Sequence, residues 1–117
     1  MSADSQKFEF SPENVARAQA HIAKYPEGRQ ASAVLPLLDL AQRQNGGWVS
    51  REAMTYIADM LGMAEIRVYE VATFYTMVNL QPVGKYLIQL CRTTPCWLCG
   101  SDDLRDACKD VLGIAQT

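Results

Sequence analysis

Apolar positions in the first part of the chain recur at helical spacing. The positions Val15, Ala18, Ile22 and Tyr25 lie three or four residues apart and so fall on one helical face. The segment 11–13 reads Ser-Pro-Glu, which supplies a capping hydroxyl, a proline at the first helical position and an acid in the first turn. The pattern predicts a first helix over 12–25, ended by Tyr-Pro-Glu-Gly.

Two more amphipathic segments follow. The first begins near Ser32, tolerates Pro36 close to its start, and is closed by the Asn-Gly-Gly of 45–47. The second is capped by Ser50 and ended by Gly62. We expect helices over 32–44 and 51–61. Their apolar stripes are Val34, Leu37, Leu38 and Ala41 in the first, and Met54, Ile57, Ala58 and Leu61 in the second.

The segment 64–76 has apolar residues nearly all the way round the expected helix. These residues are Ile66, Val68, Tyr69, Val71, Ala72, Phe74 and Tyr75. A helix that is apolar on every side is expected to be buried on every side. It is therefore either the central helix of the bundle, or a helix that also packs on the following domain or on another subunit.

The hydrophobic pattern changes after the linker 81–84. Residues 86–90 predict a short strand, 91–100 a loop, and 101–112 a last helix with acids in its first turn. The fold class is therefore α+β, with a helical bundle over 1–80 and a smaller domain over 81–117. Because one strand cannot form a sheet, we expect either a partner that supplies strands or, as we favour, a longer parent chain.

Composition narrows the class of protein. The net charge of −2 gives no reason to expect nucleic acid or an anionic membrane surface as a partner. No apolar run is long enough to span a bilayer, and the first ten residues lack the pattern of a signal or transit peptide. We expect a bacterial-type cytoplasmic protein, in which clustered thiols bind metal or carry out redox chemistry.

All four cysteines lie in the last part of the chain, and three arrangements compete. Cys91 and Cys96 are spaced as two ligands of a 2Fe-2S cluster, with the hydroxyls of Thr93 and Thr94 able to hydrogen-bond the sulfurs. Cys96 and Cys99 instead form a C-x-x-C, as in thioredoxin-like dithiols. The joint spacing of Cys91, Cys96 and Cys99 matches the start of plant-type ferredoxins, a match we regard as accidental because those have another fold. Cys108 is expected to be a small apolar residue on the last helix.

Several segments resemble one family in particular. They are Tyr25-Pro26, the stretch 29–38 (RQASAVLPLL), Gly47-Trp48-Val49, the stretch 70–77 (EVATFYTM), Gly84-Lys85-Tyr86, the loop 91–96 (C-x-T-T-P-C) and Gly100-Ser101. Together they are similar to the small 2Fe-2S subunits of respiratory NADH:quinone oxidoreductase (complex I), which form the NuoE family in bacteria. The resemblance covers almost all of residues 8–113.

The resemblance implies a helical bundle followed by a thioredoxin-like domain that holds one 2Fe-2S cluster. It implies Cys91 and Cys96 as the first ligand pair, and no cluster role for Cys99 or Cys108. The implied partners are the flavin-bearing, NADH-oxidising subunit, with its FMN and NADH, and other peripheral-arm subunits of complex I. The implied location is the cytoplasmic side of a bacterial inner membrane, bound through the complex. Related hydrogenase and formate dehydrogenase modules use a similar subunit.

Two departures from the family pattern change what we expect of the cluster site. Arg92 stands where a small residue or Thr is usual, and the family's second ligand pair, a C-x3-C, does not occur before Thr117. We therefore expect residues 81–117 to be an incomplete thioredoxin-like domain with half of a cluster site. The alternatives are a thiol–disulfide protein that uses Cys96 and Cys99, and a metal-free helical assembly module.

Overall fold

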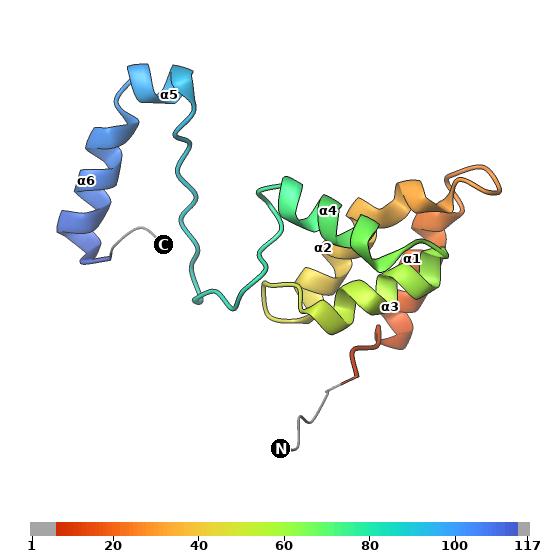
Figure 1. The fold of residues 1–117 in the computed structure, drawn as a ribbon. Coiled ribbons are helices and arrows are strands. Elements are labelled where there is room, and N and C mark those ends of the chain that lie inside the picture. Colours follow the sequence, from red (N-terminus) through yellow and green to blue (C-terminus); the bar gives the residue numbers. More distant parts are fainter. Residues whose placement is uncertain (1–6, 115–117) are drawn as a thin grey trace. The chain divides into compact units, whose positions relative to one another are not determined.

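The computed structural model describes residues 7–114, which form two compact units that divide between Gly84 and Lys85. The first unit contains α1 (Pro12–Ile22), the 3-10 helix η1 (Gln30–Ala33), α2 (Val34–Gln44), α3 (Arg51–Leu61) and α4 (Glu65–Phe74). The second contains α5 (Thr94–Leu98) and α6 (Ser101–Leu112) (Figure 1). No helix within 7–114 is long and apolar enough to cross a membrane.

The helices of the first unit begin and end where the chain supplies capping residues. Ser11 accepts a hydrogen bond from the amide of Asn14 at 3.3 Å, and Ser50 accepts one from Ala53 at 3.2 Å. Gly62 ends α3 with a φ of 65°, in the left-handed region that glycine adopts without a steric penalty. These local signals confirm the predicted starts of the first and third helices.

Of the first three predicted helices, two differ in extent from the prediction. The first helix ends at Ile22 rather than 25, and its last turn tightens into i to i+3 bonds from Lys24 to His21 and from Tyr25 to Ile22. Proline at 26 disfavours helical backbone at the residue before it. The expected helix over 32–44 is divided into η1 and α2, with Pro36 in the first turn of α2, where its missing N–H costs nothing.

The core of the first unit lies between α2, α3 and one side of α4. Its largest fully buried side chains are Leu37, Leu38, Val49, Ile57, Leu61 and Val68. All four members of each apolar stripe predicted for the second and third helices are buried. In the first helix only Ala18 is buried, while Tyr25 is 37% exposed beyond the helix end.

The segment before α1 packs on the bundle through an aromatic cluster and one glutamine. The rings of Phe8 and Phe10 both meet Tyr56 of α3 edge-on, at centroid distances of 5.8 and 5.3 Å. Gln44, at the end of α2, donates to the carbonyl of Glu9 at 2.7 Å and accepts from the Ser11 amide at 3.1 Å. The predicted extended segment around Phe8 and Phe10 is thereby held against α2 and α3.

Helix α4 is not the central helix of the bundle. Only Val68 and Ala72 are buried, whereas Ile66, Tyr69 and Phe74 are 60%, 47% and 78% exposed. The expectation of burial on every side is therefore wrong for this unit, because α4 contacts α2 and α3 with one face only. The helix ends at Phe74, since the backbone of Tyr75 is extended. Further along, the Val49 amide donates a hydrogen bond to the Asn79 carbonyl at 2.8 Å.

The strand predicted over residues 86–90 is not formed. The segment 85–93 is irregular and leads directly into α5, and no described residue forms a strand with it (Figure 1). A strand is defined by hydrogen bonds to a neighbour, so an extended sequence without a paired segment is not one. The β–α unit expected here is therefore not confirmed, and the described residues are largely helical.

The loop predicted over 91–100 is also wrong in part, because residues 94–98 form the short helix α5. Thr93 occupies its N-cap position with extended backbone angles, and Pro95 lies in its first turn. This Thr-Thr-Pro sequence is a helix-start signal, but the five helical residues that follow are too few to show a helical period in the sequence. The last helix, α6, forms over 101–112 as predicted, ended by Gly113.

Candidate metal centre

Cys91 lies just before α5, and its thiol contacts the residue that starts the helix. The Sγ of Cys91 is 3.2 Å from the Oγ1 of Thr93. Thr93 makes no side-chain capping bond to an amide of α5, so its hydroxyl is directed to sulfur instead. The hydroxyl of Thr93 lowers the pKa of Cys91 most, followed by its backbone amide and then the Cys96 thiol.

Cys96 lies within α5, half-buried, and interacts with Cys91. The pKa of Cys96 is raised, first by its hydrogen bond to Cys91 and then by the negative charge that Cys91 carries once ionised. The opposite directions of the two pKa shifts have the same cause, the interaction between the two thiols, so Cys91 and Cys96 titrate as a pair.

The other residues predicted near the thiols are arranged differently. No hydrogen bond joins the Thr94 side chain to either sulfur among residues 7–114, and Arg92 is exposed beside Cys91. Cys99 is exposed at the C-cap of α5, and Cys108 is half-buried on α6. The structure thus brings Cys91, Thr93 and Cys96 together.

Within the described part of the chain, no three His, Cys, Asp or Glu side chains are grouped as metal ligands. Cys91 and Cys96 are two neighbouring thiols, the number and kind of protein ligands that one iron of a 2Fe-2S cluster takes, and they do not by themselves make a closed four-ligand site. The four cysteines of the same described residues likewise do not form a closed zinc site. Two thiols, one of which has a lowered pKa, suit iron–sulfur ligation.

Hydrogen bonds through Trp97 join α5 to the start of α6. The indole Nε1 of Trp97 donates to Asp102 Oδ2 at 3.1 Å, and its carbonyl accepts from the Gly100 amide at 3.3 Å. Ser101, between these two partners, is 3% exposed and its Oγ has no hydrogen-bond partner. The Ser-Asp-Asp of 101–103 predicts Ser101 as the capping residue of the last helix, and this is wrong, because Gly100 is the N-cap residue of α6 and no side chain caps the helix.

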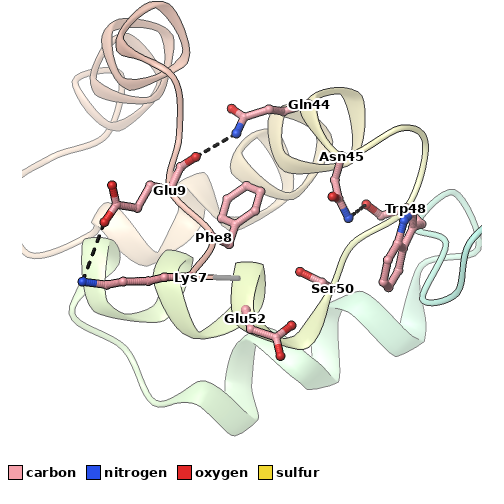
Figure 2. A pocket seen from close by; sticks show the side chains of 8 residues that line it. All are labelled: Lys7, Phe8, Glu9, Gln44, Asn45, Trp48, Ser50 and Glu52. Atoms are coloured by element: carbon pink, nitrogen blue, oxygen red, sulfur yellow. Dashed lines mark hydrogen bonds and ion pairs between the residues drawn. The ribbon is translucent and has the colours of Figure 1, made fainter. Parts of the chain in front are cut away.

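A separate pocket of about 370 Å³ lies in the first unit, between the segment before α1 and the start of α3 (Figure 2). Its polar groups already bond one another: Gln44 donates to Glu9, Asn45 to the carbonyl of Trp48 at 3.2 Å, and Lys7 pairs with Glu9 at 3.7 Å. It contains no thiol. The residues that line the pocket are Lys7, Phe8, Glu9, Gln44, Asn45, Trp48, Ser50 and Glu52.

A helical bundle followed by a unit with a paired thiol site is the arrangement of a small iron–sulfur electron carrier. The family model of the thioredoxin-like 2Fe-2S ferredoxins matches residues 18–117. The chain belongs to this family, and the resemblance seen in the sequence is confirmed.

Relatives with curated names extend the same comparison. The E subunit of NADH-quinone oxidoreductase from Rickettsia bellii is 57% identical over 114 residues, which are 97% of this chain and 68% of that protein. The E subunit from Rickettsia typhi is 58% identical over 107 residues, 92% of this chain and 63% of the relative. The mitochondrial NADH dehydrogenase (ubiquinone) flavoprotein 2 of Dictyostelium discoideum is 50% identical over 107 residues, 92% of this chain and 43% of the relative. The chain thus spans about two thirds of the bacterial proteins.

Proposed function

We propose that this chain is an electron-transfer subunit of NADH:quinone oxidoreductase, in which Cys91 and Cys96 supply one ligand pair of a 2Fe-2S cluster. The observation that carries the proposal is the interacting pair itself, with the Cys91 thiol held by Thr93 at 3.2 Å in a chain of the 2Fe-2S family. A bound cluster supplies a one-electron centre. The chain's own contribution is to hold and ionise the thiols.

Each residue near the pair has a defined part in this proposal. Thr93 favours the thiolate of Cys91, the form that binds iron. The pKa of Cys96 is raised first by its hydrogen bond to Cys91 and then by the negative charge of Cys91. Because a bound iron would take the place of the proton between the two sulfurs, Cys96 would give up its proton on ligation. Thr94 lies next to Thr93 and is a further hydroxyl near the cluster. Cys99 and Cys108 take no part in ligation.

The partner we propose is the flavin-bearing, NADH-oxidising subunit, which contributes FMN and the NADH site. The large apolar side chains that α4 leaves exposed, Ile66, Tyr69 and Phe74, support this because exposed apolar surface often marks a protein–protein contact. The relatives are by name subunits of a larger oxidoreductase. We accordingly place the chain in the peripheral arm of complex I, on the cytoplasmic side of the membrane.

The small thioredoxin-like unit of residues 81–117 belongs to the same proposal. We propose that the segment 86–90 becomes a strand when paired, which would complete a β–α unit with α6. Its successive side chains Tyr86, Leu87 and Ile88 are exposed in this structure, as an unpaired strand segment would be.

A cysteine series in the full-length subunit, produced together with its flavin partner, tests the ligand assignment. Cys91→Ser and Cys96→Ser are expected to lose the visible and EPR signals of the 2Fe-2S cluster and its iron. Cys99→Ser and Cys108→Ser are the matched controls and should retain both. Retention of the cluster in Cys91→Ser, with loss in Cys99→Ser, would overturn the proposal.

The thiol–disulfide alternative has a clear requirement that the structure does not support. Such a protein needs an attacking thiolate of lowered pKa within its C-x-x-C. In this chain the pKa of Cys96 is raised instead, by Cys91, which lies outside that motif. The lowered pKa belongs to Cys91, the residue that the ligand assignment uses.

A further inference from the structure

The thiols of Cys91 and Cys96 are hydrogen-bonded to each other, although four residues lie between them in the chain. Cys91 lies in the irregular segment 85–93, and Cys96 lies in the first turn of α5. Helical side chains lean toward the N-terminus of their helix, so the Cys96 side chain is directed back toward the segment that holds Cys91. The two sulfurs are therefore neighbours in the chain without a bound ligand.

Both thiols of the pair can be reached from solvent. Cys91 is exposed, Cys96 is half-buried, and neither is part of a disulfide in the structure. A dissolved oxidant would therefore meet Cys91 first and leave its oxidised sulfur beside a second thiol. Oxidised cysteines with such a neighbour condense to a disulfide, whereas isolated ones go on to the irreversible sulfinic and sulfonic acids.

The other two cysteines of the chain are placed differently. Cys99 is exposed at the C-cap of α5, and the hydrogen bond of the Cys96 thiol goes to Cys91 rather than to Cys99. Cys108 is half-buried on α6. Because the backbone around Cys91 belongs to neither a helix nor a strand, it can adjust to the narrow geometry that a disulfide requires. These observations favour a bond from Cys96 to Cys91 over one within the C-x-x-C.

We propose that Cys91 and Cys96 form a reversible disulfide when the cluster-free chain meets hydrogen peroxide. The Cys91 sulfur attacks one oxygen of the peroxide, the O–O bond breaks, and a sulfenic acid and one water are formed. The Cys96 sulfur then attacks the Cys91 sulfur, so that the S–S bond forms and the hydroxyl group leaves as a second water. Each thiol loses one hydrogen, and the peroxide is reduced to two waters.

The consequence for cluster loading rests on the function proposed above. A disulfide uses both sulfurs of the ligand pair, and only thiolates bind iron. The oxidised chain must therefore be reduced before the pair can take up its iron.

Trypsin can locate the disulfide because Arg92 lies between the two cysteines. Cleavage after lysine and arginine places Cys91 in the peptide 86–92 and Cys96 in the peptide 93–105. The metal-free, reduced full-length subunit is treated with hydrogen peroxide, its remaining thiols are blocked with N-ethylmaleimide, and the digest is mapped by mass spectrometry without reductant. We expect the two peptides to be joined, and to separate after treatment with dithiothreitol.

Cys99 lies in the same peptide as Cys96, so two variants distinguish these cysteines. The joined peptides should persist in Cys99→Ser and be lost in Cys96→Ser. A disulfide confined to 93–105 in the wild type would overturn the inference, as would sulfinic acid at Cys91 without any disulfide. A bond between two copies of the chain, seen as a dimer on a non-reducing gel, would overturn it too.

The peptide map requires no cluster, so it separates this inference from the proposed function. Reconstitution with iron and sulfide should give the 2Fe-2S spectrum in the reduced protein and lose most of it in the oxidised protein, with recovery after dithiothreitol. A full spectrum while the two peptides remain joined would overturn the control of cluster loading. No spectrum in the reduced protein would instead overturn the proposed function, whatever the peptide map shows.

Discussion

Thr93 is the N-cap residue of α5, yet its hydroxyl lies 3.2 Å from the Sγ of Cys91 instead of capping the helix. A Thr at an N-cap normally accepts a bond from a helix amide. In this chain that bond is absent, and the same residue lowers the pKa of Cys91 through both its hydroxyl and its amide. The residue that starts α5 therefore stabilises the thiolate of Cys91 instead of capping the helix with its side chain.

Replacing Thr93 with Val should raise the pKa of Cys91 toward its ordinary value, because the hydroxyl that favours the thiolate is lost. Only the thiolate is alkylated, so iodoacetamide labelling of Cys91 in the metal-free protein near neutral pH should slow a few-fold. Mass spectrometry across a pH series measures this. Thr94→Val is the matched control and should label at the wild-type rate; equal rates in both variants would contradict the prediction.

Two isoleucines of the bundle, Ile57 and Ile66, should differ sharply in their effect on stability when each is truncated to alanine. Ile57 is fully buried in α3, and Ile57→Ala should cost about 2–5 kcal/mol of unfolding free energy through lost burial and a cavity. Ile66 is 60% exposed on α4, and Ile66→Ala should stay within about 0.5 kcal/mol. Urea unfolding followed by circular dichroism compares them. A similar loss in both would mean that α4 is buried after all.

The contribution of the α3 capping bond to the stability of the bundle should be measurable by itself. Ser50 accepts from the Ala53 amide at 3.2 Å, so Ser50→Ala should destabilise the bundle by about 1 kcal/mol and lower its Tm by a few degrees. Ser32 is exposed within η1 and makes no capping bond. Ser32→Ala should therefore leave the Tm near wild type, and an equal drop would rule out the cap as the cause.

The exposed side of α4 should matter for assembly and not for folding. Phe74 is 78% exposed, and Phe74→Ser should weaken binding to the flavin-bearing subunit about tenfold while the unfolding curve of the free chain is unchanged. Surface plasmon resonance or co-purification gives the affinity. Tyr25→Ser, at an aromatic residue 37% exposed beyond α1, is the control expected to bind normally. Normal binding by Phe74→Ser would remove α4 from the interface.

The helix limits and the buried helix faces depend on residues that are close together in the chain, so they could be predicted from the sequence. Ser11, Ser50 and Gly62 act within one helical turn, so the helix limits they set were predicted correctly. The stripe of Leu37, Leu38 and their neighbours is periodic, and periodicity alone indicates which face is buried. Family membership could also be predicted from the sequence, because the residue sequences of the segment 70–77 and the loop 91–96 are specific to the family.

Other features depend on what lies across space, and the sequence could not determine them. Residues 86–90 have the composition of a strand, but strand formation requires a second segment to accept and donate hydrogen bonds. Helix α4 has apolar residues all round, yet which of them are buried depends on how α2 and α3 cover it. The short α5 was missed because a helix of five residues has too few positions to show a period.

In the segment that holds the cysteines, too, some features were determined by the sequence and others only by the tertiary structure. The sequence by itself determined that Cys91 and Cys96 are spaced as a ligand pair and that the chain belongs among 2Fe-2S proteins. Only the tertiary structure decided that the Thr93 hydroxyl contacts sulfur, and that Ser101 is enclosed without a partner. Spacing is a property of the covalent chain, whereas burial and hydrogen bonding are properties of how the helices pack.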